Sequence, residues 1–300
     1  MKKIFYGAIY SFKEIKNSKI FYSFLIFALI LISGSYFVSQ TSFINQGRIM
    51  VDFSIFAISI FNIFIGIFIG ASIVYDDIEK KSIFLTITRP LRRTEYLIGR
   101  FLGLASAITF STIIMMLIFY SVLLIMHKFI VPAIPSPAVG GSDIKSAIDV
   151  SSVSRPFILY LLPQPLIIQA LFIVIESIFI SAAALLFSLI TSKALASIFA
   201  ILVFFIGNVS SRMNDLIKPV KKIMNGKTVT VHQANHTLAA IVHFIYIVLP
   251  NFSIFNISSE AAYKISISGG TIIYRIIYGL CYTILLFVIA SLIFNRKDIS

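Results

Sequence analysis

Six long apolar segments with almost no charged residues decide what this chain can fold into. A helix rises about 1.5 Å per residue and the hydrocarbon core of a bilayer is about 30 Å thick, so roughly 20 apolar residues cross it. Only 12% of the residues are charged and 58% are hydrophobic, which is typical of an integral membrane protein and not of a soluble domain. We therefore expect an all-α integral membrane protein, a single transmembrane domain over residues 1–300, with six transmembrane helices. The expected spans are residues 20–40, 53–75, 98–126, 166–190, 194–211 and 272–294.

Basic residues lie beside these spans in an alternating pattern. Five lysines precede the first span, six basic residues from Lys80 to Arg100 fill the link between the second and third spans, and Arg296 and Lys297 follow the sixth. Short segments rich in Lys and Arg stay on the cytoplasmic side of a membrane. We therefore expect both termini in the cytoplasm and the inner (cytoplasmic) membrane as the location. The formal net charge of +13 then reflects contact with membrane lipids, and we expect no nucleic-acid partner.

Residues 1–19 show a different pattern, in which apolar residues recur at helical spacing between lysines. This pattern predicts an amphipathic helix that lies in the cytoplasmic interface of the membrane before the first span. A solvated tail is the alternative. The apolar stripe consists of Ile4, Phe5, Ala8, Ile9, Phe12 and Ile15.

Two longer links, residues 127–165 and 212–271, are expected to be loops on the outer side. The first holds six of the nine prolines, which predicts irregular structure. The second contains residues 238–250, which are apolar but too few to cross a bilayer. We interpret them as a re-entrant or interfacial helical segment before the last span. Joined to the residues up to 257, they would instead form a seventh span and place the C-terminus outside.

Polar residues are few inside the spans. Glu176 lies near the middle of the fourth span, Gln169 lies seven residues earlier on the same face, and Asn62 lies in the second span. A charge at such depth costs roughly 2.5–3.5 kcal/mol on insertion scales, so Glu176 should face protein or water. We expect these three residues either to pack between helices or to line a pathway. Small residues at four-residue spacing, such as Gly66 and Gly70, indicate helix–helix contacts.

The sequence has no recognisable pattern for enzyme chemistry. It lacks nucleophile motifs and a complete phosphate-binding loop, and its single cysteine, Cys281, excludes a disulfide within the chain. His232, His236 and His243 share one face if their segment is helical, but no carboxylate or cysteine lies near them in sequence. We interpret them as solvated or interfacial histidines, with a metal site as the alternative. We expect neither catalysis nor metal binding.

The segment DDIEKKSIFLTITRPLRRTEYLIGRFLG, residues 76–103, resembles the stretch after the second span in type-2 ABC exporter permeases. That family typically has an acidic residue, Glu-x-Gly-Thr-Leu, Arg-Pro-x-x-Arg and then Gly-Lys-x-x-Gly where the third span begins. Lys81 stands here in place of the usual Gly. The amphipathic start, the six spans and the outer apolar segment agree with the family over nearly the whole chain. The matching residues are Glu79, Ser82, Arg89, Pro90, Arg92 or Arg93, Gly99 and Arg100.

The resemblance implies that residues 77–96 are a cytoplasmic coupling helix that docks into a groove of a separate ABC ATPase subunit. Apolar residues of the segment would form the contact and charged residues would steer it. The ATPase, present in two copies, would bind ATP and Mg, and this chain would bind no cofactor. A second permease copy or a paralogue would complete the transporter. The expected contact residues are Asp77, Glu79, Lys81, Ser82, Phe84, Leu85, Arg89, Pro90, Arg92 and Arg93.

The expected function is that of a permease, which forms the translocation pathway of an exporter driven by ATP hydrolysis on its partner. An ion-coupled secondary transporter or a channel is the alternative, and it would need carboxylate–base networks or inverted repeats within the spans. A membrane-embedded enzyme is a further alternative, and it would need a clustered catalytic set. Holding the loop in the cytoplasm is the other role that the arginines of the segment could have. The residues leave the substrate class open.

Overall fold

The computed structural model describes residues 2–40, 46–79, 93–130, 164–217, 220–224, 227–231, 250–257 and 267–296. These residues form seven α-helices, a short 3₁₀ helix and one antiparallel hairpin of two strands. The elements in chain order are α1 (Lys2–Lys16), α2 (Lys19–Ser39), α3 (Gln46–Glu79), α5 (Arg93–Ile130), α7 (Gln164–Ile190), α8 (Lys193–Ile217), β1 (Val220–Met224), β2 (Lys227–Val231), η2 (Phe252–Phe255) and α11 (Gly269–Arg296).

Five of these helices, α2, α3, α5, α7 and α11, are long and apolar enough to cross a membrane. They coincide with five of the six expected spans, so the chain is a helical membrane protein. The helix α3 is longer than its expected span because its polar end, up to Glu79, continues the helix past the apolar stretch. In α8 the apolar part, Lys193–Val209, is shorter than in the other five helices. A crossing by residues 194–211 therefore stays a prediction.

The hairpin departs from the all-α expectation. The strands β1 and β2 pair with Val220 opposite Val231, within residues 212–271 that we expected to be a loop. The sequence contains the signal for it, because an Asn-Gly pair at 225–226 stands before a run of Thr and Val residues. The expected loop over residues 127–165 is also shorter than predicted, because α5 continues to Ile130 and α7 begins at Gln164. The expected re-entrant segment, residues 238–249, lies outside the described residues.

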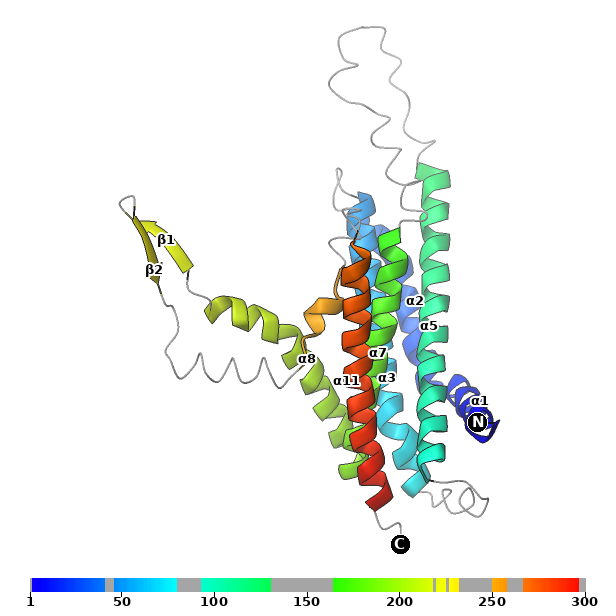
Figure 1. Cartoon of the computed structure of the whole chain (residues 1–300). Helices are drawn as coiled ribbons and strands as arrows, with labels where there is room; N and C mark the ends of the chain where they lie inside the picture. Colours follow the sequence, from blue (N-terminus) through cyan, green and yellow to red (C-terminus); the bar gives the residue numbers. More distant parts are fainter. Residues whose placement is uncertain are drawn as a thin grey trace.

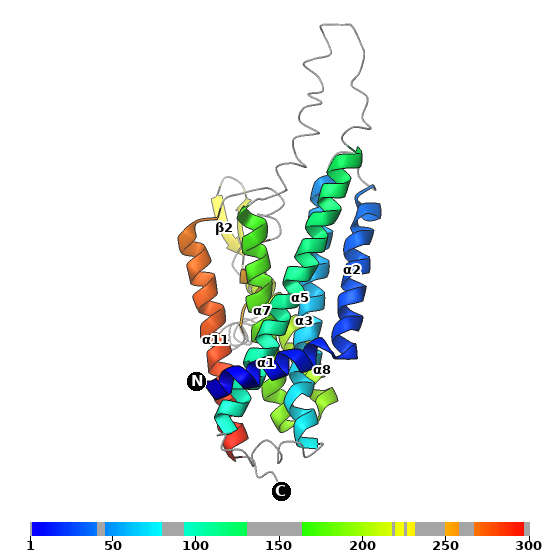
Figure 2. The same cartoon turned by 90° about the vertical axis from the view of Figure 1, so that its right-hand side faces the viewer.

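The long helices stand side by side, and α1 lies across their lower end (Figures 1 and 2). The helix α3 packs against α2, α5 and α7, and α7 also packs against α8 and α11. At the lower end of the bundle α3 ends and α5 begins (Figure 1). The ends of the expected coupling segment 77–96 therefore belong to α3 and α5, and its middle lies outside the described residues. The hairpin lies apart from the bundle, to the left in Figure 1.

Glycines allow α3 and α7 to approach each other closely. A Cβ atom added at Gly66 would lie 2.9 Å from the backbone oxygen of Ser177, and one added at Gly70 would lie 2.9 Å from that of Ser181. Small side chains let helix backbones come together in a membrane, where van der Waals contact replaces the hydrophobic effect as the main attraction. The small residues Gly66 and Gly70 of α3 and Ser177 and Ser181 of α7 therefore form the contact between the two most buried long helices.

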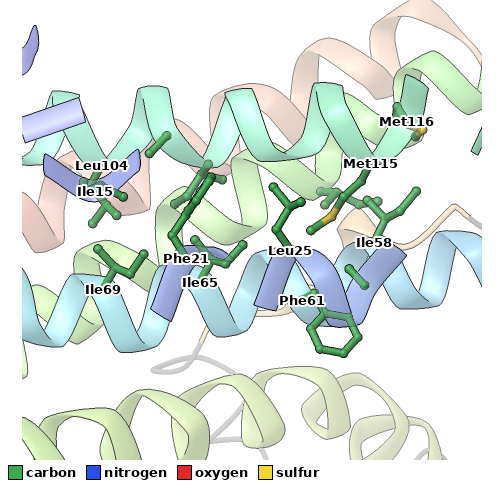
Figure 3. Close-up of a cluster of buried hydrophobic side chains, with 14 of the residues drawn as sticks. Ile15, Phe21, Leu25, Ile58, Phe61, Ile65, Ile69, Leu104, Met115 and Met116 are labelled. Atoms are coloured by element: carbon green, nitrogen blue, oxygen red, sulfur yellow. The ribbon is translucent and has the colours of Figure 1, made fainter. Parts of the chain in front are cut away.

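The core extends from the membrane helices down to α1. Figure 3 shows side chains of four helices in contact, among them Phe21 and Leu25 of α2, Ile65 of α3 and Leu104 of α5. Ile15 of α1 belongs to the same cluster and is 3% exposed. This burial connects the end of α1 to the bundle, and the position of α1 in a membrane interface stays a prediction.

A second cluster forms around η2. The rings of Phe252 and Phe255 are buried between α7, α8 and α11, and Phe252 contacts Phe179 with ring centroids 4.9 Å apart. The side chain of Asn251 caps the turn by accepting a hydrogen bond from the backbone of Ser253. The segment before α11 is thereby fixed to the inside of the bundle.

Candidate functional site

Arg100 is the centre of a polar cluster at the lower end of the bundle. It lies two turns into α5, and its side chain is 9% exposed. Its Nη2 pairs with Asp77 of α3, and its Nη1 pairs with Glu14 of α1. Nη1 also donates to the hydroxyl of Ser11 at 3.4 Å. One guanidinium group therefore connects three helices, which suits arginine because its planar fork carries five donors.

Tyr96 extends this cluster to a fourth helix. Its hydroxyl accepts a hydrogen bond from Nε of Arg100 at 3.2 Å and donates one to Asp77. Its ring stacks on Phe294 of α11, with centroids 6.2 Å apart. The Arg100 guanidinium lies 5.6 Å from the Tyr96 ring and 5.7 Å from the ring of Tyr10. Aromatic faces and carboxylates thus surround the charge on several sides, as its burial requires.

Close backbone contact between α1 and α5 makes this cluster possible. An added Cβ atom at Gly99 would lie 3.4 Å from atoms of Gly7, and one at Gly103 would lie 2.8 Å from the backbone oxygen of Ala8. The two helices cross at these glycines, which places Ser11 and Glu14 within reach of Arg100. The Gly99–Arg100 pair therefore has a structural role. The lack of a side chain at Gly99 allows α1 to approach α5, and Arg100 binds Ser11 and Glu14 of α1.

Two further contacts connect the same helix ends to the rest of the bundle. Lys193, the first residue of α8, pairs with Asp76 at 3.1 Å. Arg93, the first residue of α5, donates from Nη1 to the backbone oxygen of Asn295 in α11 at 3.5 Å. The residues just before and just after the segment 80–92 thus contact α1, α8 and α11.

The structure places only part of the expected docking surface. Asp77 is buried in the Arg100 cluster, Glu79 ends α3 and Arg93 begins α5. Asp77 therefore faces inward and helps to hold the helix ends. The remaining expected contact residues lie outside the described residues: Lys81, Ser82, Phe84, Leu85, Arg89, Pro90 and Arg92.

The three polar residues expected inside the spans are buried, and each contacts a different element. Asn62 accepts a hydrogen bond from Ser111 of α5 and donates to the backbone of Ile58. The side-chain oxygen of Gln169 accepts from the backbone of Ile257 at 2.8 Å. Glu176 is hydrogen-bonded by the side chain of Asn208 in α8. They do not converge on one site in this structure, and each connects its helix to a neighbour.

A groove opens between α5 and α7, with a volume of about 380 Å³. Met116 and Leu117 of α5 and Leu166 and Leu171 of α7 line it, together with the hydroxyl-bearing residues Thr109, Thr112 and Tyr120. Asn62, Gln169 and Glu176 do not line it. The groove is thus an apolar surface on the side of the bundle.

Groups of acidic, histidine or cysteine residues that could hold a metal ion do not occur within the described residues. His232, His236 and His243 lie outside that part of the chain, so neither the solvated or interfacial position nor the metal site is tested for them.

The sequence matches no protein-family model and no curated protein. The resemblance to type-2 ABC exporter permeases therefore rests on residues 76–103 and on the pattern of spans.

Proposed function

We propose that this chain is the membrane-spanning permease subunit of an ABC exporter, with ATP hydrolysed on a separate ATPase subunit. The motif in residues 76–103 and the amphipathic start support this proposal. In the proposed complex, two ATPase subunits act on the cytoplasmic side of the inner membrane. A second permease copy or a paralogue completes the pathway, and both termini of the chain are cytoplasmic.

The observation that carries the proposal is the Arg100 cluster at the ends of the segment 80–92. Asp77 lies three residues before this segment and Tyr96 four residues after it, and both are bound to the same guanidinium group. A force on the segment would therefore act on α3 and α5 together. It would also reach α1 through Glu14 and α11 through Phe294. A segment that receives motion from an ATPase needs such connections to the helices that move.

A second permease subunit fits the side of the bundle that carries the groove. Several large apolar residues on α5, α7 and α11 remain exposed, such as Leu117, Ile167 and Leu280. The groove itself has almost no polar lining, so one subunit alone does not enclose a polar pathway in this region. We propose that the pathway forms where two such bundles meet, which is the usual solution for a symmetric assembly.

Site-specific photocrosslinking tests the proposal. The chain is co-expressed with a stand-alone ABC ATPase from the same genome, and a photoreactive phenylalanine analogue replaces Phe84 within the segment 80–92. We expect a crosslink between the permease and the ATPase. The matched control places the same analogue at Phe37, which is 76% exposed and lies near the end of α2 that is remote from the segment 80–92. A crosslink at Phe37 and none at Phe84 would contradict the proposed docking site, and no ATPase capture at all would contradict the function.

A further inference from the structure

Arg275 of α11 has a buried donor with no acceptor among the described residues. Its Nη1 atom is buried and has no hydrogen-bond partner within the described part of the chain. Its guanidinium lies 5.7 Å from the ring of Phe172 in α7. A ring face attracts a cation but does not accept the in-plane hydrogens of the guanidinium edge. The ring therefore leaves the hydrogens of this Nη1 atom without an acceptor among the described residues.

The side chain of Arg275 turns inward, away from the lipid-facing surface of α11. That surface is marked by Ile273, Tyr274 and Ile277, which are 59%, 60% and 55% exposed. Phe172, the residue beneath the guanidinium, is fully buried in the second core cluster. Arg275 thus differs from an arginine that extends along the outside of a helix into water.

The depth of Arg275 limits which ligands can reach it. A helix of 28 residues such as α11 is about 42 Å long, which exceeds a hydrocarbon core of about 30 Å by about 6 Å at each end if the helix is centred. Arg275 lies six residues after Gly269, or about 9 Å along the axis. Its Cα atom is therefore close to the boundary between acyl chains and headgroups, where the phosphates of phospholipids lie.

The surroundings of Arg275 favour an anion. Among the described residues no carboxylate forms an ion pair with it, although other arginines of the chain do so: Arg48 pairs with Asp52, and Arg100 with two carboxylates. Gln169 of α7, one turn from Phe172 towards the helix start, adds a buried amide beside the same helix contact. A guanidinium edge binds the oxygens of phosphate with parallel hydrogen bonds, which few other groups match.

We propose that Arg275 binds a phosphate group between the upper ends of α7 and α11. The phosphate belongs either to the headgroup of a phospholipid or to a free phosphate compound, because the same oxygens are presented in both. This inference does not depend on the proposed transport function, since any membrane protein with this geometry could hold a lipid at this position.

Thermal unfolding of the full chain in an uncharged detergent tests the proposal. The protein has 13 tyrosines and no tryptophan, so tyrosine fluorescence reports unfolding. The probes are dihexanoyl phosphatidylglycerol, inorganic phosphate and, as a phosphate-free blank, dihexanoylglycerol. A ligand that binds only the folded state raises the midpoint, and we expect a shift of roughly 2–4 °C at a probe concentration about ten times its Kd. A shift with the lipid alone identifies a headgroup, and a shift with both phosphate probes shows that phosphate is sufficient.

Variants connect the shift to Arg275. In Arg275→Gln the shift should disappear, and in Arg275→Lys the probe concentration that gives the same shift should rise several-fold, because lysine lacks the planar edge. Arg48→Gln is the matched control, since Arg48 lies near the same end of the bundle and is paired. If Arg275→Gln does not fold, the lysine variant carries the test. An unchanged shift in the Arg275 variants, an equal loss in Arg48→Gln, or no shift with either phosphate probe would overturn the proposal.

Discussion

At the level of single residues, the two carboxylates that bind Arg100 lie in different surroundings. The side chain of Asp77 is 13% exposed, whereas that of Glu14 is 50% exposed. Water screens an exposed ion pair, so such a pair contributes little to stability. A buried pair is screened less, and removal of one member leaves a charge without compensation. Asp77 is therefore the partner that the folded state requires.

We expect Asp77→Asn to destabilise the protein by about 3–5 kcal/mol, because it leaves the buried guanidinium with one exposed carboxylate. Glu14→Gln should cost less than about 1 kcal/mol. Thermal or denaturant unfolding in detergent measures both variants against the native chain. Glu14→Gln serves as the matched control because it removes a charge from the same arginine. Equal losses of stability in the two variants would contradict the assigned roles.

The motif around Arg100 was visible in the sequence, but its role in the structure was not. The sequence predicts a docking segment over residues 77–96, whereas the structure pairs Asp77 with Arg100, which also pairs with Glu14 of α1. Ser11 and Glu14 are 89 and 86 positions from Arg100, and no periodic pattern predicts contacts over such separations. One signal was available: a charge inside an apolar helix needs a partner. The same rule applies to Arg275, at which we propose a phosphate site.

At the level of elements, hydropathy predicts that a helix exists more reliably than where it ends. The five long apolar helices follow from their apolar residues, yet α3 and α5 extend past the expected limits because hydrogen bonding in a helix continues through polar residues. The hairpin β1–β2 was missed because an interpretation based on membrane spans treats everything between spans as loop. Contacts such as that of Gly70 with Ser181 follow from the four-residue spacing of small residues.

The contact between α3 and α7 leads to a prediction at this scale. In Gly70→Ala the new methyl group would lie 2.9 Å from the backbone oxygen of Ser181, so the helices must separate. We expect a loss of about 1–3 kcal/mol in the free energy of unfolding. Gly34→Ala in α2 is the matched control, because nothing lies within 4 Å of its added Cβ atom. This control should be neutral or up to about 1 kcal/mol more stable, since alanine favours helix. Similar effects in both variants would show that close approach does not matter.

At the level of the whole molecule, the direction of α11 supports an even number of crossings. Arg275 lies over Phe172, and Tyr282 contacts Phe179, so α11 and α7 run in the same direction. The helix α7 ends at the lower end of the bundle and α11 begins at the upper end (Figure 1). The chain between Ile190 and Gly269 must therefore return across the membrane. Although the apolar part of α8 is short, this return supports the prediction of six spans with both termini on one side.

Cysteine labelling tests this arrangement. The exposed Cys281 is replaced by alanine, and single cysteines are introduced at Ser192, Thr228 and Ser300. In intact cells a membrane-impermeant maleimide should label Thr228→Cys and leave the other two unlabelled, because α8 carries the chain outward. After the cells are opened, all three should react. If Thr228→Cys stays protected and Ser300→Cys remains inside, the crossing occurs after the hairpin. Labelling of both Thr228→Cys and Ser300→Cys in intact cells would contradict six spans.

The last prediction concerns how an ATPase would be held at the lower end. Protein interfaces depend on a few buried anchors, and full burial of a Phe-sized group contributes about 1.5–3 kcal/mol. Charges at the rim contribute less, mainly to the rate of association, and salt screens them. In the segment 80–92 the apolar residue of this size is Phe84, and Arg92 is a charged neighbour. Arg93 also holds α11 through Asn295, so its removal alone would mix docking with bundle stability.

We therefore expect Phe84→Ala to reduce recovery of the ATPase with the permease more than Arg92→Ala does, while both variants still insert into the membrane. Raising the salt from about 50 to 500 mM shortens the screening length to less than half, so it should weaken the native complex. The complex of the Arg89→Ala, Arg92→Ala double variant should change less with salt, because it has lost charges that salt screens and leaves Arg93 in place. Co-purification at both salt concentrations measures how much ATPase is recovered with each variant. Leu117→Ala, on the exposed side of α5, is the control for a substitution outside the docking segment. If Phe84→Ala and the double variant both bind the ATPase as the native chain does, the arginines serve only to hold this loop in the cytoplasm.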